Sequence, residues 1–367
     1  MNQNKTTSRE PLFHVVKRPE RSGRQMLLFR LGAVALSILA GGLFILAIGY
    51  NPIEIYGTIL NGAFRSKIAV QSTIKITIPL CISALGATLA FKMKFWNIGG
   101  EGQIIMGGVF ATYFALFHAD WPHLPLMIVC FLAGLIGGGL WGLIPALFKV
   151  KWNTNETLLT LMLNYIALYI ISWLQNGPWR DPTANGFPKI AAFAKNAVLG
   201  KVLGVQAGWI VMLVFTVLVW VYLKFTKQGY EVAVVGESQD TARYAGIHVK
   251  KVILRTMFLS GAIGGVCGML QACGTDATLS TGIAGGVGFT AIIVAWLCQL
   301  NPGMILVVSF LFGVLEKGSG VVQSSYGLST DCAAVLQGII LFFILASEFF
   351  VRYAFAGRSS AKGGKKA

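Results

Sequence analysis

Long apolar runs, separated by short polar or basic stretches, restrict most strongly how this chain can fold. The first run, 27–50, follows a polar and basic stretch. It is too long for the core of a signal peptide and lacks a small-residue cleavage site, so we expect it to be retained as a helix. An α-helix crosses the hydrocarbon core of a bilayer with about 20 apolar residues. Only 12% of the 367 residues are charged. The sequence therefore predicts an all-α integral membrane protein with many spans.

The apolar runs predict about ten transmembrane helices in a single domain, 27–351, between basic tails at 1–26 and 352–367. The predicted spans are 27–50, 73–91, 102–117, 124–148, 157–174, 208–224, 252–274, 289–300, 303–315 and 332–350. The net charge is +16, and most of the 30 lysines and arginines fall in the tails and in alternate connections, which places both termini in the cytoplasm. No basic stripe with interleaved aromatic residues accompanies this charge, so we expect no nucleic-acid partner.

Ten spans divide into two sets of five, and an odd number per set inverts the second half relative to the first. The predicted halves are about 27–175 and 206–350. A glycine-rich break follows the second span at 98–102, and another follows the seventh span at 274–288. Interrupted segments at matching positions of inverted repeats indicate the binding site of a transporter.

The first break lies in the segment 95–103, which reads FWNIGGEGQ. Lipid offers no hydrogen-bonding partner to the backbone of this segment or to the carboxylate of Glu101. Inside a membrane the segment must therefore be buried in protein or line a cavity. In that case we expect Glu101 to be hydrogen-bonded by the amides of its own glycine turn or by Asn97 and Gln103. The alternative is a hydrated loop at the membrane surface.

Two further segments carry polar residues in an ordered pattern. An N-cap sequence at 153–156 precedes the fifth span, where Thr157, Thr160 and Asn164 share one helix face. These side chains either contact a substrate or hydrogen-bond a neighbouring helix, and the pattern leaves both open.

The cytoplasmic loop 225–251 contains a short, well-capped helix. Ser238 is a good N-cap, Asp240 and Arg243 suit the first and last turns, and Gly246 suits the stop. Such a helix suits a groove on a partner protein, although it could instead rest on lipid headgroups.

Several classes of function are disfavoured by what the sequence lacks. No phosphate-binding G-x-x-x-x-G-K-[ST] motif occurs, so we expect no ATP hydrolysis by this chain. The predicted spans carry few acids and bases, which argues against proton coupling, although a Na⁺-coupled carrier remains possible. The six cysteines lack C-x-x-C spacing, and the histidines at 118 and 123 fit an interfacial turn, so we expect no metal site.

Three windows of the sequence resemble the membrane subunit of bacterial ABC importers for nucleosides and related sugars, within the larger group of ribose and branched-chain amino-acid permeases. They are WNIGGEGQ at 96–103, NETLLTLMLNY at 155–165 and VGESQDTARYAGI at 235–247, and the likeness extends over about 73–301. The chain departs from the family pattern at Gly100, where alanine is common, and at Phe289 and Thr290, where many members have an aspartate after the phenylalanine.

The resemblance implies a multi-pass permease of the bacterial cytoplasmic membrane that is not itself an enzyme and binds no cofactor. Its partners would be a second permease subunit, a cytoplasmic ATPase that uses ATP, and an extracellular substrate-binding lipoprotein. The implied substrate pathway comprises Trp96, Asn97, Gly99, Gly100, Glu101, Gln103, Asn155, Glu156, Thr160, Asn164, Phe289 and Thr290. The implied ATPase-coupling residues are Gly229, Tyr230, Gly236, Glu237, Ser238, Ala242, Arg243, Tyr244 and Gly246.

Other classes of function remain open at this point. They are an ion-coupled secondary carrier that works without an ATPase, an ABC permease for another small solute such as ribose or a branched-chain amino acid, and a membrane scaffold that transports nothing.

Overall fold

The computed structural model describes residues 13–17, 23–184, 186–328 and 353–357, together with helical residues 335–336, 338–339, 342–343 and 346. The chain divides into two units. The main unit is Thr58–Tyr326, and the terminal unit combines Met1–Gly57 with Gly327–Ala367.

The terminal unit joins the two ends of the chain. Strand β1 (Phe13–Lys17) pairs antiparallel with β4 (Tyr353–Gly357), with Phe13 opposite Gly357 and Lys17 opposite Tyr353. Both strands lie in stretches that the sequence predicted as simple tails, and the sheet was not foreseen because its partners are at opposite ends of the chain. Helix α1 (Gly23–Ala47) corresponds to the first predicted span, and the tenth predicted span lies mostly outside the described residues.

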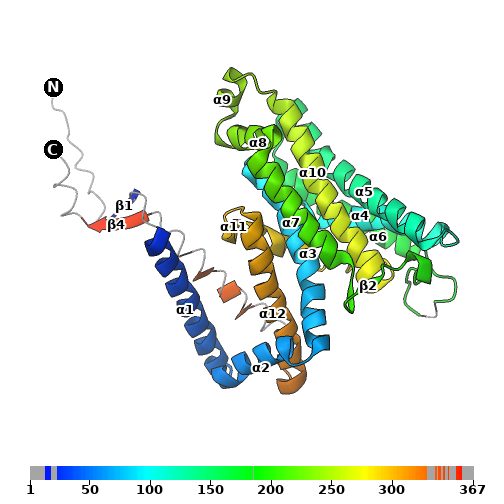
Figure 1. The fold of residues 1–367 in the computed structure, drawn as a ribbon, viewed down its shortest axis with the longest axis horizontal. Helices are drawn as coiled ribbons and strands as arrows, with labels where there is room; N and C mark the ends of the chain where they lie inside the picture. Colours follow the sequence, from blue (N-terminus) through cyan, green and yellow to red (C-terminus); the bar gives the residue numbers. More distant parts are fainter. Residues whose placement is uncertain are drawn as a thin grey trace, which may run out of the picture. The chain divides into compact units, whose positions relative to one another are not determined.

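The main unit is a bundle of long apolar helices (Figure 1). Within the described residues, six helices are long and apolar enough to cross a membrane, or seven spans if the bent pair Ala35–Ala47 and Pro52–Phe64 counts as one. The chain is therefore a mostly helical, multi-pass membrane protein. The remaining elements are the following: α2 (Pro52–Phe64), α3 (Lys67–Lys92), α4 (Gly100–Phe117), α5 (His123–Trp152), α6 (Glu156–Asn176), η1 (Lys195–Ala197), β2 (Lys201–Val202), β3 (Val205–Gln206), α7 (Gly208–Phe225), α8 (Lys227–Glu237), α9 (Gln239–Tyr244), α10 (Val249–Leu270), η2 (Gln271–Asp276), α11 (Val287–Leu297) and α12 (Pro302–Tyr326).

Glycine contacts bring α4, α5 and α10 close together at the centre of the bundle. A Cβ on Gly107 would collide with the backbone of Gly265, and a Cβ on Gly138 would collide with Gly261. Small residues at helix contacts let backbones approach closely, which is how helices associate in lipid, where apolar burial gives no net drive. These three helices are therefore closely packed, and two of them adjoin the breaks: α4 follows the first glycine-rich break and α10 precedes the second.

Helix α12 continues to Tyr326, well beyond the predicted end at 315, so that predicted boundary is wrong. The charged pair Glu316 and Lys317 ends the apolar run without ending the helix. Tertiary contacts hold this extension in place, because Gly318 packs directly against Ile59 of α2.

The main unit has two distinct ends (Figure 1). Helices α8 and α9 lie at one end, and the short hairpin β2–β3 lies at the opposite end. Residues 177–207 form an irregular segment at the β2–β3 end, where Phe193 N–H donates to Ala277 O at 2.8 Å and Leu199 N–H donates to Cys273 O at 2.8 Å.

Candidate functional site

The first break begins where α3 ends, and the backbone there turns sharply. Lys94 adopts the left-handed conformation with φ 55°, and Phe95 N–H donates back to Ala90 O at 3.1 Å. The chain then runs without regular structure until α4 begins at Gly100. The break is therefore a short reversal that leads the chain back into the bundle.

A buried pair of amides holds the interior of this break. Asn97 Nδ2 donates to Gln103 Oε1 at 3.4 Å, and Gln103 Nε2 donates to Asn97 Oδ1 at 3.3 Å. Asn97 Oδ1 also accepts from Gly99 N–H at 3.0 Å, and Ser260 Oγ of α10 lies 3.5 Å from Asn97 Nδ2. Both amides are only 3% exposed. Their mutual bonds show why two neutral amides can be buried here at low cost.

Helix α6 binds the backbone of the same break through Thr160 and Asn164, two of the three polar residues predicted to share one helix face. Thr160 Oγ1 accepts from Ile98 N–H at 3.2 Å, and Asn164 Nδ2 donates to Ile98 O at 2.9 Å. Asn164 Oδ1 accepts from Gly102 N–H at 2.8 Å. Both side chains therefore form hydrogen bonds to a neighbouring segment, which is one of the two roles that the sequence left open. Their contact with a substrate stays a prediction.

Glu101 connects the first break to the second. Its Oε2 accepts from Gly288 N–H at 3.2 Å, across 187 positions of the sequence, and the residue is only 8% exposed. The expectation that Glu101 would be held by Asn97, Gln103 or its own glycine turn is therefore wrong, because the two amides are occupied with each other. A Cβ on Gly100 would lie 3.4 Å from Gly288 Cα. The two breaks meet directly, and this contact excludes the hydrated surface loop.

The second break enters the bundle beside α4. Leu279, Ile283 and Ala284 are 1 to 4% exposed, and a Cβ on Gly108 of α4 would collide with Ile283. Helix α11, which follows, has only 11 residues. Non-helical backbone at membrane depth is tolerated where protein buries it or where it lines water. The predicted eighth span, 289–300, is therefore a short helix, and the irregular backbone of the second break precedes it.

A stacked tryptophan pair also joins the two breaks. Trp96 of the first break lies 5.7 Å from Trp296 of α11, with ring planes inclined by 20°, and both rings contact Phe91 at the end of α3. Trp96 is 50% exposed and Trp296 is 40% exposed. The sequence analysis missed Trp296. Its position near the end of the span that follows the second break was the signal that could have identified it. Only the fold shows that its partner is Trp96.

Four predicted pathway residues lie outside the amide network. Asn155 caps α6, where its Oδ1 accepts from Thr157 N–H at 3.0 Å, and Glu156 forms an ion pair of 2.9 Å with Lys149. Phe289 is 42% exposed, and Thr290 Oγ1 bonds to a carbonyl of its own helix start. The cap and the ion pair fix the start of α6, and they place its polar face opposite the break.

The loop 225–251, predicted to be cytoplasmic, contains two helices, α8 and α9. Ser238 Oγ accepts from Thr241 N–H at 3.2 Å, and Gly246 ends the helix turn with φ 76°, as predicted from the sequence. Gly229 and Gly236 are sites of close approach, because a Cβ on Gly236 would collide with Lys92 O. Four side chains predicted to couple to an ATPase are exposed: Tyr230, Glu237, Arg243 and Tyr244.

This hairpin of α8 and α9 packs onto the first break through a buried apolar cluster. Phe95 and Met93 of the break lie in one cluster with Val232 and Val235 of α8 and Ala242 of α9. The cluster also contains Ala90, Ala146, Val249, Val252, Ile253 and Met257. Close-packed interiors transmit displacement instead of absorbing it. A shift of the hairpin therefore acts on the break.

No group of three or more His, Cys, Asp or Glu side chains suited to a metal occurs in the part of the chain that the structure describes. Of the two histidines considered, His118 packs against Trp121 with ring centroids 4.7 Å apart, and His123 Nδ1 bonds to Asn196 O at 2.9 Å.

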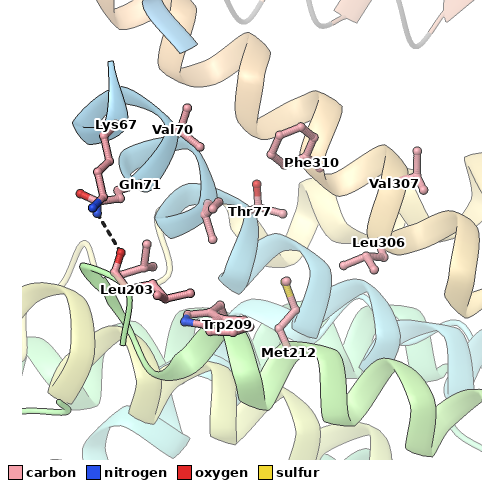
Figure 2. Close-up of a pocket in the computed structure, with 12 residues that line it drawn as sticks. Lys67, Val70, Gln71, Thr77, Leu203, Trp209, Met212, Leu306, Val307 and Phe310 are labelled. Carbon is pink, nitrogen blue, oxygen red and sulfur yellow. Dashed lines mark hydrogen bonds between the residues drawn. The ribbon is translucent and has the colours of Figure 1, made fainter. Parts of the chain in front are cut away.

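An apolar groove of about 740 Å³ lies elsewhere, between α3, α7 and α12 (Figure 2). Trp209, Met212 and Phe310 line it, and Gln71 Nε2 donates to Leu203 O at its edge at 2.8 Å. Because its walls are almost wholly apolar, the groove does not share the chemistry of the two breaks.

Comparison with known proteins places this arrangement in a family. Residues 69–345 match the family model described as a branched-chain amino acid transport system permease component. The chain belongs to this permease family. The permease is 30% identical to the glucose ABC transporter permease protein TsgB13 of Haloferax volcanii, over 88% of this chain and 89% of that protein.

Two further relatives cover nearly the whole chain. The guanosine ABC transporter permease protein NupP of Bacillus subtilis is 30% identical over 92% of the permease and 97% of its own length. The nucleoside ABC transporter permease protein NupB of Lactococcus lactis is 29% identical over 91% of the permease and 96% of its own length.

Proposed function

We propose that this chain is the permease subunit of an ATP-driven importer and forms the translocation pathway for nucleosides or related sugars. The observation that carries the proposal is the joint between the two breaks, where Glu101 accepts from Gly288 N–H inside the bundle. Such a joint can open and close by a small relative movement of two packed segments. The names of the relatives, with guanosine, nucleoside and glucose permeases among them, support the class of solute.

The hairpin of α8 and α9 is the proposed input for ATP hydrolysis by a cytoplasmic ATPase. Tyr244 is 93% exposed and Tyr230 is 66% exposed, so aromatic side chains are available to a partner protein. The opposite side of the hairpin is buried against Phe95. A movement of the partner can thus pass through the hairpin to the break.

The residues that follow Phe95 extend this mechanism. Phe95 is buried in the hairpin cluster, whereas the adjacent Trp96 is half exposed and stacks on Trp296. A displacement of Phe95 by the hairpin would shift Trp96 relative to Trp296 and separate the two halves at this point. The paired rings would thereby act as a gate whose opening accompanies the ATPase cycle.

Ten spans in two inverted halves with both ends in the cytoplasm remain part of the proposal. Pairing of β1 with β4 supports it, because two ends that pair must lie on the same side of the membrane, which requires an even number of crossings. Lys92 and Lys149 in the last turns of α3 and α5 and Lys227 at the start of α8 belong to helix ends near α8 and α9. We therefore propose that this end faces the cytoplasm at a bacterial inner membrane.

The remaining partners follow from the importer architecture. A second permease, similar or identical, would complete the pathway, and an extracellular binding lipoprotein would deliver the solute to the β2–β3 end. Five of the pathway residues proposed from the sequence, Trp96, Asn97, Gln103, Thr160 and Asn164, supply amides, a hydroxyl and an indole without charge, which suits a neutral solute with many hydrogen-bonding groups.

Uptake measurements test the function directly. Cells that lack the gene should lose uptake of tritiated guanosine, and a plasmid copy should restore it. Unlabelled adenosine, glucose, ribose and leucine, each added in excess, identify the solute class by competition. Unchanged uptake of labelled guanosine and labelled glucose in cells that lack the gene, with uptake of labelled leucine lost, would exclude the proposed solute class.

The source of energy separates an importer from an ion-coupled carrier. We expect depletion of ATP to stop uptake while an ionophore that collapses ion gradients leaves initial uptake nearly unchanged. We also expect a tagged permease to co-purify with an ATPase and a second permease. The opposite response to ATP depletion and ionophore would establish a secondary carrier.

A further inference from the structure

A polar cavity lies apart from the proposed pathway, between α2, the first turns of α3 and the C-terminal half of α12. Its volume is about 620 Å³. Arg65 and Lys317 line it together with the neutral polar side chains of Asn61, Ser72 and Ser325. No acidic residue is among the described residues that line the cavity. The lining therefore combines two positive charges with hydrogen-bond donors, which is the chemistry of an anion site.

Within the described residues, the side chains of Arg65 and Lys317 form no hydrogen bond or ion pair, and Glu316 does not line the cavity. Lys317 is only partly exposed and belongs to α12, one of the helices apolar enough to cross a membrane. A cation in a spanning helix is costly unless an anion or water compensates it, so the cavity calls for a negatively charged occupant.

The surroundings of the cavity indicate that the anion carries hydrocarbon. Ile68 of α3 lines the cavity and is 74% exposed, and Leu60 and Phe64 of α2, next to lining residues in sequence, are 57% and 49% exposed. Cationic side chains beside exposed apolar ones are typical of a helix at the interface between headgroups and acyl chains. A free inorganic anion has no hydrocarbon that could cover these apolar side chains.

We propose that Arg65 and Lys317 bind the phosphate of an anionic phospholipid whose acyl chains cover Leu60, Phe64 and Ile68. The hydroxyl group of Ser325 and the amide of Asn61 donate further hydrogen bonds to the headgroup. Helix α2 thus anchors the main unit to the lipid. The groove of Figure 2 differs, because Lys67 is the one charged side chain among the described residues of its lining. This site involves neither break and does not depend on the solute that the permease carries.

Native mass spectrometry of the purified full-length permease, in mixed phosphatidylglycerol and phosphatidylethanolamine, tests the site. Because each cation near a membrane surface contributes about 1 kcal/mol to anionic lipid binding, Arg65→Gln with Lys317→Gln should lower retained phosphatidylglycerol on the order of tenfold relative to phosphatidylethanolamine. Arg65→Lys with Lys317→Arg should retain it. Lys67→Gln, which removes a neighbouring cation outside the cavity, is the matched control and should also retain it.

Wild-type protein supplies a second measurement that needs no variant. Its melting temperature should rise when phosphatidylglycerol is added to phosphatidylcholine nanodiscs, and excess inorganic phosphate should not reverse the rise. Equal lipid retention by the double glutamine variant and the wild type would overturn the proposal, as would equal loss in Lys67→Gln. Displacement of the lipid by inorganic phosphate would assign the cavity to a free anion and overturn the lipid assignment.

Discussion

The two glycine-rich breaks meet at one point but are held from opposite ends of the bundle. The first break is bound by side chains of α6 and packs on the hairpin of α8 and α9 through Phe95. The second break is bonded to the segment 177–207, where Thr278 Oγ1 donates to Ile190 O at 3.1 Å and Gln206 Nε2 donates to Thr275 Oγ1 at 3.0 Å. Each break is therefore held at a different end of the main unit.

This difference shows how the two ends of the main unit are connected through one small contact. The two breaks have surroundings that differ in composition. The first break has buried amides that bond to each other, whereas the second has apolar Leu279 and Ile283 against α4. The joint of Glu101 and Gly288 links a polar, tightly bonded segment to an apolar, packed one.

The largest effect on stability and uptake is expected from an alanine substitution at Gly288, in the second break. A Cβ at Gly288 would collide with the Glu101 backbone, whereas a Cβ at Gly100 would lie 3.4 Å from Gly288 Cα, an ordinary contact. Overpacking a tight core costs about 1–3 kcal/mol or more. Gly288→Ala should lose both stable protein and uptake, and Gly100→Ala should retain both. Protein level, melting temperature and guanosine uptake measure this, and similar behaviour of the two variants would refute the geometry of the joint.

Removal of the Glu101 side chain tests the hydrogen bond across the joint. Glu101→Ala should abolish uptake at a normal protein level, because Gly288 N–H loses its acceptor. Glu101→Gln keeps an oxygen that accepts a hydrogen bond and should impair uptake less. Uptake is compared at matched expression. Normal uptake by Glu101→Ala would show that the joint does not organise the pathway.

Loss of the α6 side chain should weaken the first break more than a matched change weakens the second. Asn164→Ala leaves Gly102 N–H and Ile98 O without their partner, at a cost of about 1–3 kcal/mol for each buried group. Gln206→Ala removes one bond to Thr275 Oγ1, whose hydroxyl still donates to Gln271 at 2.8 Å. The melting temperature in detergent should fall further in Asn164→Ala. A larger fall in Gln206→Ala would reverse the comparison.

The smallest effect on stability is expected at the end of α9. Gly246 has φ 76° and nothing within 4 Å of a Cβ position, so Gly246→Val adds only backbone strain of roughly 1–2 kcal/mol. Uptake and co-purification of the ATPase should both fall while the protein level stays normal. Gly246→Asn, which tolerates the left-handed conformation, is the control. Unchanged uptake and co-purification in Gly246→Val would remove the coupling role.

Local sequence was enough to predict most helices of the main unit, since each depends on an apolar run and on caps close in the chain. The stop at Gly246 and the cap at Ser238 are of this kind, as is the shared face of Thr160 and Asn164, because helical periodicity alone places them. Family membership also followed from three short windows, since those windows carry residues that the fold needs in fixed order.

Only the tertiary structure decided which groups meet. The partner of Glu101 lies 187 positions away, and local reasoning could offer only nearby donors such as Asn97, which is already bonded to Gln103. Trp296 stacks on Trp96, and β1 pairs with β4, for the same reason. Helix α12 continues past Glu316 because Gly318 packs on Ile59, a contact that no hydropathy pattern contains. Close packing between distant segments sets these pairs, and a sequence pattern records only what neighbours along the chain require.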